Sequence, residues 1–193
     1  MNKLKKISLG LGALIIVGAF ILIVGGWLIT SYNSFITQNE DVNTQWAQVE
    51  TQYQRRFDLI PNLVEAAKGI FEQEKDVFGA LAEARSRYAG ASTPSQKAEA
   101  ATQVEGALSR LLVIVENYPE LRSSESVQTL MAQLEGTENR VSVERSRYNG
   151  VARDYNLAIQ KVPSRYAASL FGFEQRPYFE AAEGAQLAPQ VQF

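Results

Sequence analysis

Ten consecutive residues in the first third of the chain hold its densest group of polar side chains in an apolar setting. Positions 55–64 read Arg-Arg-Phe-Asp-Leu-Ile-Pro-Asn-Leu-Val. The residues there that bear on chemistry or on chain direction are Arg55, Arg56, Asp58, Pro61 and Asn62. Arginine among large apolar side chains suits either an ion pair that fixes the arrangement of packed helices or a recognition site for an anionic group or a peptide. We expect the ion pair.

Acidic residues later in the chain offer partners for these arginines, namely Glu135, Glu138 and Glu144. Glu135 and Glu138 are three positions apart and so share one helix face, where carboxylates alone could hold Ca²⁺ or Mg²⁺. Asp58 or Glu116 could serve as a general acid or base. A solvated or salt-bridged helix face accounts for the same residues, and we predict no catalytic residue, no metal and no cofactor.

The composition narrows the chemistry further. The chain has no His and no Cys, which removes the usual ligands of zinc and the usual members of nucleophilic triads. Beyond the three lysines near the N-terminus, 16 basic and 21 acidic residues remain. An acidic balance of this kind does not form the basic surface that nucleic acid requires, so no nucleic-acid partner is expected.

Apolar residues recur every three or four positions over three long stretches, which predicts three amphipathic helices. The first follows Val42, Trp46, Val49, Tyr53, Phe57, Ile60, Val64, Ala67 and Phe71, is kinked at Pro61 and ends near Gly90. The second runs from Pro94 or Ser95 to Asn117 or Tyr118, and its apolar run at residues 111–115 should be enclosed on several sides. The third runs from about Val127 to the residue before Pro163, with Thr137 and Glu144 as polar positions on its apolar face.

Residues 7–30 form an uncharged apolar run after a basic start at Lys3, Lys5 and Lys6. Its 24 residues would make a helix about 36 Å long, against a hydrocarbon core of about 30 Å. A cleaved signal peptide is the alternative, but the run is about twice as long as such a peptide's apolar region and lacks a small-residue cleavage site. We therefore predict a transmembrane helix, with the lysines placing the N-terminus in the cytoplasm and the rest of the chain outside it.

These stretches divide the chain into a basic N-terminus at residues 1–6, the transmembrane helix at 7–30, a helical bundle at 31–163 and a C-terminal segment at 164–193. The last of these holds a short helical or irregular piece followed by aromatic residues that should pack on the bundle, and its end at 183–193 should be extended or mobile. The fold class is all-α: an N-terminal transmembrane helix and an antiparallel bundle of three long helices, counted as four if the first is split or kinked at Pro61.

The ten-residue run at positions 55–64, after an N-terminal membrane segment and Tyr32-Asn33, resembles the LemA family. The resemblance continues through short motifs along the chain: Glu116-Asn117-Tyr118-Pro119, Leu134-Glu135-Gly136-Thr137-Glu138, Tyr148-Asn149, Tyr155-Asn156, Phe171-Gly172-Phe173 and Tyr178-Phe179-Glu180. It implies a bacterial envelope protein with a helical outer domain and no established activity. A magnetosome-associated member of the family suggests, by analogy, work in membrane organisation.

The sequence thus predicts a single-pass protein of the bacterial cytoplasmic membrane that acts without catalysis, as a scaffold or protein-interaction module. Its expected partners are the lipid bilayer, through residues 7–30, and either further copies of itself or another envelope membrane protein. The alternative is a metal-binding, ligand-binding or hydrolytic outer domain that uses Arg55, Arg56 and Asp58 with Glu135 and Glu138. We do not expect the outer helices to lie on lipid, because their acidic balance opposes attraction to anionic bilayers.

Overall fold

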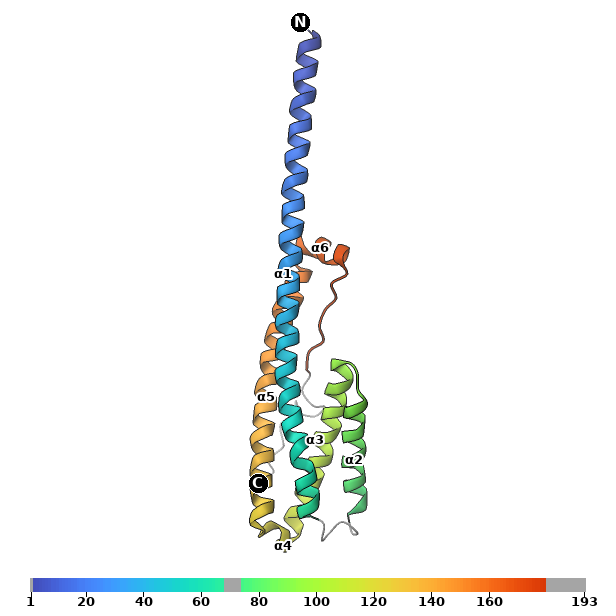
Figure 1. The fold of residues 1–193 in the computed structure, drawn as a ribbon, viewed down its shortest axis with the longest axis vertical. Helices are drawn as coiled ribbons and strands as arrows, with labels where there is room; N and C mark the ends of the chain where they lie inside the picture. Colours follow the sequence, from blue (N-terminus) through green and yellow to red (C-terminus); the bar gives the residue numbers. More distant parts are fainter. Residues whose placement is uncertain (1, 68–73, 180–193) are drawn as a thin grey trace, which may run out of the picture. The chain divides into compact units, whose positions relative to one another are not determined.

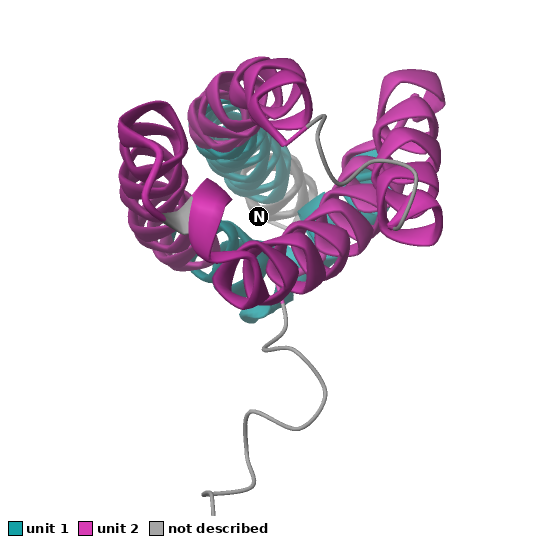
Figure 2. Ribbon diagram, turned by 90° about the horizontal axis from the view of Figure 1, so that it is seen from below, with its two compact units in different colours: residues 1–42, 151–176 teal, residues 43–150, 177–193 magenta. Residues whose placement is uncertain are grey.

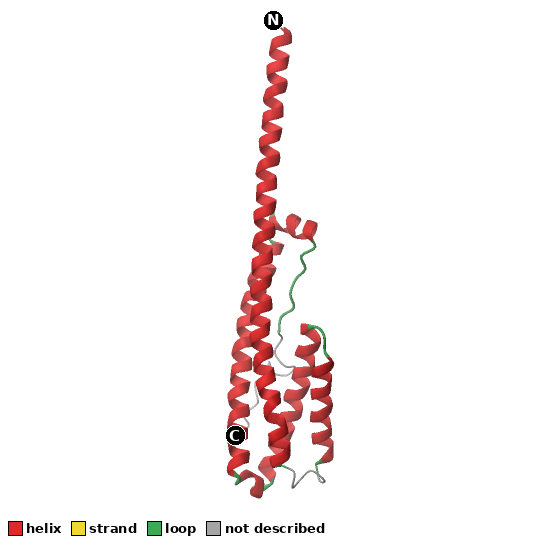
Figure 3. Ribbon diagram, in the orientation of Figure 1, coloured by secondary structure: helices red, strands yellow, loops and turns green. Residues whose placement is uncertain are grey.

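The computed structural model describes residues 2–67 and 74–179, and every regular element in these ranges is a helix (Figures 1 and 3). The helices are α1 (Asn2–Ala66), α2 (Lys75–Gly90), α3 (Pro94–Asn117), α4 (Pro119–Arg122), α5 (Glu125–Gln160) and α6 (Ser164–Phe171). The predicted all-α class, with one long apolar helix at the N-terminus and further helices after it, is confirmed.

Helix α1 carries the apolar stretch and the first part of the first amphipathic stretch, as far as Ala66, without a break between them. Within the described ranges it is the one helix long and apolar enough to cross a membrane. Large side chains of the stretch such as Leu14, Ile16 and Leu22 are exposed, as they would be in a helix whose surroundings are lipid.

The first predicted amphipathic helix is in fact two helices, and the division does not fall at Pro61. Pro61 lies inside α1, which ends at Ala66, and α2 begins at Lys75. Residues 68–73 lie outside the described ranges, and they include Phe71, one of the apolar residues of the first predicted amphipathic helix. The apolar spacing of the sequence continues across this division, so the spacing alone gives no sign of where the first helix ends.

Local signals place the other helix ends. Helix α2 ends at Gly90, as predicted, and α3 begins at Pro94 with a capping box in which Thr93 and Gln96 bond each other's backbone N–H. Helix α3 ends at Asn117, before Pro119, within the predicted limits. The predicted turn after it contains the short helix α4. The run at residues 111–115 is less enclosed than its composition suggests, because Val113 is exposed and only Leu111 and Val115 are buried.

The chain forms two compact units (Figure 2). Unit 1 comprises residues 1–42 and 151–176, and unit 2 comprises residues 43–150 and 177–193. The core of unit 2 is apolar, and its fully buried side chains include Val49, Tyr53, Leu63, Val104, Leu108, Leu111, Val115, Val127 and Val141. Val49 and Tyr53 belong to the spacing predicted for the first amphipathic helix, whereas Leu63 is buried in place of the predicted Val64.

Unit 1 is built around the start of α1, the end of α5 and α6. Phe35, Tyr155 and Ala168 are among its buried residues. Its C-terminal segment is held by the side chain of Asn156, whose Nδ2 donates to the carbonyl of Arg176 and whose Oδ1 accepts from the N–H of Arg176, both at 2.8 Å. The Arg176 guanidinium in turn donates to Oδ1 of Asn39 at 2.8 and 3.0 Å.

Candidate functional site

A network of charged side chains lies among the helices of unit 2, close to its core. Arg56 is only 6% exposed. Its Nη1 donates to Glu105 Oε1 at 3.2 Å, and its Nη2 bonds to Glu138. The same Glu105 oxygen accepts from Arg145 Nη2 at 2.5 Å, and Arg145 Nε donates to the Tyr53 hydroxyl at 2.9 Å. The network therefore links α1, α3 and α5.

Burial is the main influence on the ionisable members of this network. It raises the pKa of Tyr53 to about 12, although Arg145 acts in the opposite direction. Burial also raises the pKa of the Glu105 carboxyl, and here Arg145 and Arg56 both oppose it. For Arg145, burial alone would lower the pKa, but Tyr53 and Glu105 beside it raise it overall. Two arginines around one carboxylate are what allow that carboxylate to be enclosed.

Within the described residues, the network satisfies most of its own hydrogen-bonding groups. The exception is Nε of Arg56, which is buried and has no hydrogen-bond partner. Arg56, Glu105 and Arg145 have their charges directed at one another, so none of them is presented as a free base or nucleophile.

The residues singled out in the sequence divide into two groups. Arg56 and Glu138 are brought together, and Glu144 accepts a hydrogen bond from Gln45 Nε2 at 2.7 Å. The rest are exposed: Arg55, Asp58, Pro61, Asn62, Glu116 and Glu135. Among them, Asp58 accepts from Gln54 of the next turn at 2.8 Å, and Glu135 borders a groove that also has Arg56 and Glu138 in its lining. In the described ranges, no three acidic side chains gather as they would around a metal ion.

Glu105 and Arg145 are essential to the network, and sequence reasoning missed both. A signal for Arg145 existed. Steps of four and three lead from Val141 through Arg145 to Tyr148, just as steps of three and four lead through Glu144. Glu105 likewise stands four residues after Ala101 and three before Leu108. Spacing alone does not say which of two adjacent residues faces the neighbouring helix.

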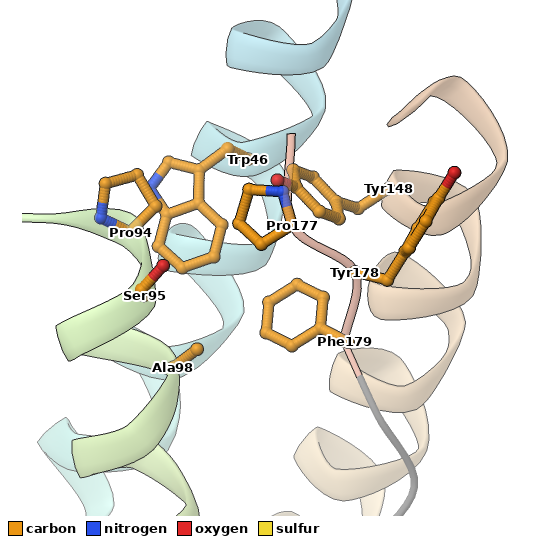
Figure 4. Close-up of a pocket in the computed structure, with 8 residues that line it drawn as sticks. All are labelled: Trp46, Pro94, Ser95, Ala98, Tyr148, Pro177, Tyr178 and Phe179. Atoms are coloured by element: carbon orange, nitrogen blue, oxygen red, sulfur yellow. The ribbon is translucent and has the colours of Figure 1, made fainter. Parts of the chain in front are cut away.

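An aromatic pocket lies at one end of α3 in unit 2 (Figure 4). Its lining residues are Trp46, Pro94, Ser95, Ala98, Tyr148, Pro177, Tyr178 and Phe179. The rings of Trp46 and Phe179 are stacked, with centroids 5.6 Å apart, and Tyr148 meets both edge-on at 5.9 and 5.2 Å. None of the eight lining residues is charged. The pocket suits apolar, aromatic or proline side chains, which aromatic surfaces bind well.

The wall of this pocket that comes from the C-terminal segment is held by Asn149. Its Nδ2 donates to the carbonyl of Phe179, and its Oδ1 accepts from the N–H of Phe179, both at 2.8 Å. Asn156 makes the same pair of bonds to Arg176 within unit 1. Two of the short motifs in the sequence, Tyr-Asn at 148 and at 155, therefore do the same work: the asparagine fixes the backbone of a residue far along the chain.

Arg145 connects the charge network with the aromatic pocket. Its guanidinium carbon lies 5.4 Å from the centroid of the Tyr53 ring and also 5.4 Å from that of Phe179. Cations are attracted to the faces of aromatic rings. The residue that helps to neutralise Glu105 therefore also lies against the Phe179 ring, which lines the pocket.

The chain is similar in sequence to a known protein family and to several known proteins. The family model described as the LemA family matches residues 45–193, well over half of the chain. Magnetosome protein MamQ 2 of Paramagnetospirillum magneticum is 28% identical over 189 residues, which cover 83% of this chain and 70% of that protein. Magnetosome protein MamQ of Magnetospirillum gryphiswaldense is 29% identical with the same coverage. The matched family region contains the whole charge network and the whole aromatic pocket, and it excludes the apolar stretch of α1.

Proposed function

Because the chain belongs to the LemA family through residues 45–193, and these residues include an uncharged aromatic pocket, we propose that its outer domain is a protein-interaction module held at a membrane. The pocket carries the proposal. It binds by contact: three interlocked rings present apolar surface, and prolines at 94 and 177 stiffen its rim. A segment of another protein that offers an apolar, aromatic or proline side chain would fit it.

The charge network supports a structural role for the polar cluster rather than a catalytic one. An enzyme that used Arg55, Arg56 and Asp58 together would need them to converge, yet Arg56 is buried while Arg55 and Asp58 are exposed. Arg56 and Arg145 share Glu105 as their common partner. We therefore assign the cluster to positioning the helices that carry the pocket.

A photocrosslinking experiment in native membranes tests the proposed interaction. A photoreactive amino acid replaces Tyr178, which lines the pocket and is exposed. The matched control carries it at Val113, an exposed apolar position on α3 outside the pocket. We expect one defined adduct from position 178, identified by mass spectrometry as another protein or a second copy. The same adducts from both positions, or none from 178, would reject the proposal.

We also propose that residues 7–30 span the bacterial cytoplasmic membrane with the N-terminus inside. The support is the apolar stretch of α1, the three lysines before it and the absence of Lys and Arg from residues 31–39. The chain has no cysteine, so single cysteines report topology cleanly. A membrane-impermeant maleimide added to spheroplasts should label Val113→Cys at once and Asn2→Cys only after lysis. The reverse order would show that the orientation is wrong.

A further inference from the structure

Helix α6 in unit 1 presents apolar side chains to its surroundings. Tyr166 is 70% exposed and Leu170 is 68% exposed. They stand four residues apart and therefore share one face of the helix. Val162, two residues before the helix begins, is 72% exposed. A group of large apolar side chains that the rest of the chain leaves exposed usually marks a surface that binds another protein or a membrane.

The opposite face of α6 is packed and holds the helix in place. Ala167 and Ala168 are buried. Gly172 follows the helix with φ of +74°, and the N–H of Phe173 returns to the carbonyl of Ala168 at 3.0 Å. This is the usual end of a helix on a glycine, and it turns the chain so that the Phe173 ring meets Phe35 of α1 at 5.2 Å. The exposed face is therefore fixed in direction.

Helix α6 joins α1 where the apolar stretch ends. The Phe171 ring, at the last residue of α6, meets the ring of Tyr32 at 5.0 Å, and Phe173 meets it at 5.8 Å. Tyr32 lies two residues beyond Thr30, which is about 3 Å along a helix axis. Figure 1 shows α6 beside this part of α1. If residues 7–30 cross the hydrocarbon core, α6 is at the depth of the lipid headgroups.

The charges around α6 also differ from those of the outer domain as a whole. Residues 155–173, which include α6 and the chain on both sides of it, hold the two basic residues Lys161 and Arg165 and no acidic residue. Lys161 is next to Val162 in the sequence and Arg165 is next to Tyr166, and both basic residues are exposed. Tyrosine and basic side chains next to leucine and valine are typical of helices that lie in a membrane interface.

We propose that α6 lies in the headgroup layer of the bilayer that α1 crosses, with Val162, Tyr166 and Leu170 directed into lipid. This gives the chain a second membrane contact, more than 130 residues after the first. It also reverses, for this one helix, the expectation from net charge, because the local balance is basic. The proposal rests on the proposed membrane span of residues 7–30.

Depth-dependent quenching tests the proposal on the full chain. Single cysteines at Leu170, Ser169, Val113 and Ile23 are labelled with an environment-sensitive fluorophore, and each protein is reconstituted into vesicles of phosphatidylcholine and phosphatidylglycerol. A nitroxide attached near the headgroup end of the lipid chains serves as the quencher. Ser169 is the neighbour of Leu170 on another side of α6, Val113 is an exposed apolar residue in unit 2, and Ile23 lies within the proposed span.

We expect the quencher to reduce the emission at position 170 strongly, to reduce it less at 169, and to leave position 113 unchanged. If the quencher reduced the emission at position 170 no more than at position 113, while Ile23 was quenched, the proposal for α6 would be overturned and the span would stand. Unquenched Ile23 would instead reject the span. A label at 170 that is shielded from water but not quenched would mean that protein, such as a second copy, covers α6, and this too would overturn the proposal.

Discussion

Replacing Arg56 with alanine is expected to lower the free energy of unfolding by about 3 kcal/mol, because removal of one partner leaves buried charge uncompensated. Arg56 is buried and bonds Glu105 and Glu138 at once. The cost should lie at the lower end of the range for broken buried ion pairs, since Glu105 keeps Arg145 and Glu138 is partly exposed. Urea unfolding of the full chain in mild detergent would measure it, with Trp46 fluorescence as the probe and Trp27 changed to phenylalanine.

The adjacent Arg55→Ala variant is the matched control. It removes the same side chain from the next residue of α1, but Arg55 is exposed. Its effect should remain within about 0.5 kcal/mol, as for most surface substitutions. If the two variants were destabilised equally, the charge network would contribute no more to the stability of unit 2 than an exposed side chain does.

Replacing Tyr148 with alanine should cost about 3–5 kcal/mol, the range typical of large aromatic residues removed from a core. Tyr148 is buried, and its ring lies edge-on to both Trp46 and Phe179. The truncation therefore leaves a void beneath the stacked pair and loosens the wall that Phe179 forms. The same unfolding measurement gives the free energy, and the Trp46 emission of the folded variant should shift to the red as water enters the pocket.

Tyr178→Ala supplies the comparison for that experiment. Tyr178 lines the same pocket but is 48% exposed. Its truncation removes contact surface from the pocket without opening the core, so stability should change by no more than about 0.5 kcal/mol. A Tyr148 variant as stable as the Tyr178 variant would show that the aromatic cluster contributes little to unit 2.

Sequence patterns predicted the helices wherever local chemistry decides their ends. Pro94 at the first turn of α3, Pro119 just beyond its end and Gly90 at the end of α2 each act through their own backbone geometry. The division between α1 and α2 was missed because apolar spacing continues across it. Apolar residues at helical spacing indicate which side chains can be buried, but they do not show whether one helix or two carry those side chains.

The site was predictable only in part, for a related reason. Arg56 stood out because it is charged among apolar residues, and Glu138 was one of three acidic candidates. The choice of Glu105 as the shared partner depends on how α3 packs beside α1, which no local pattern encodes. The aromatic pocket could not be predicted from the sequence. Its wall at residues 177–179 is fixed by the Asn149 side chain, a contact across 30 positions of sequence.

The unbroken course of α1 has a mechanical consequence for unit 1. One part of a helix cannot rotate about the helix axis relative to the next part without breaking hydrogen bonds from each N–H to the carbonyl four residues before it. The apolar stretch and the Tyr32–Phe35 turn that seats Phe171 and Phe173 therefore rotate as one piece. A protein that bound one side of the apolar stretch inside a bilayer would therefore also fix the direction in which α6 projects from α1, measured around the membrane normal.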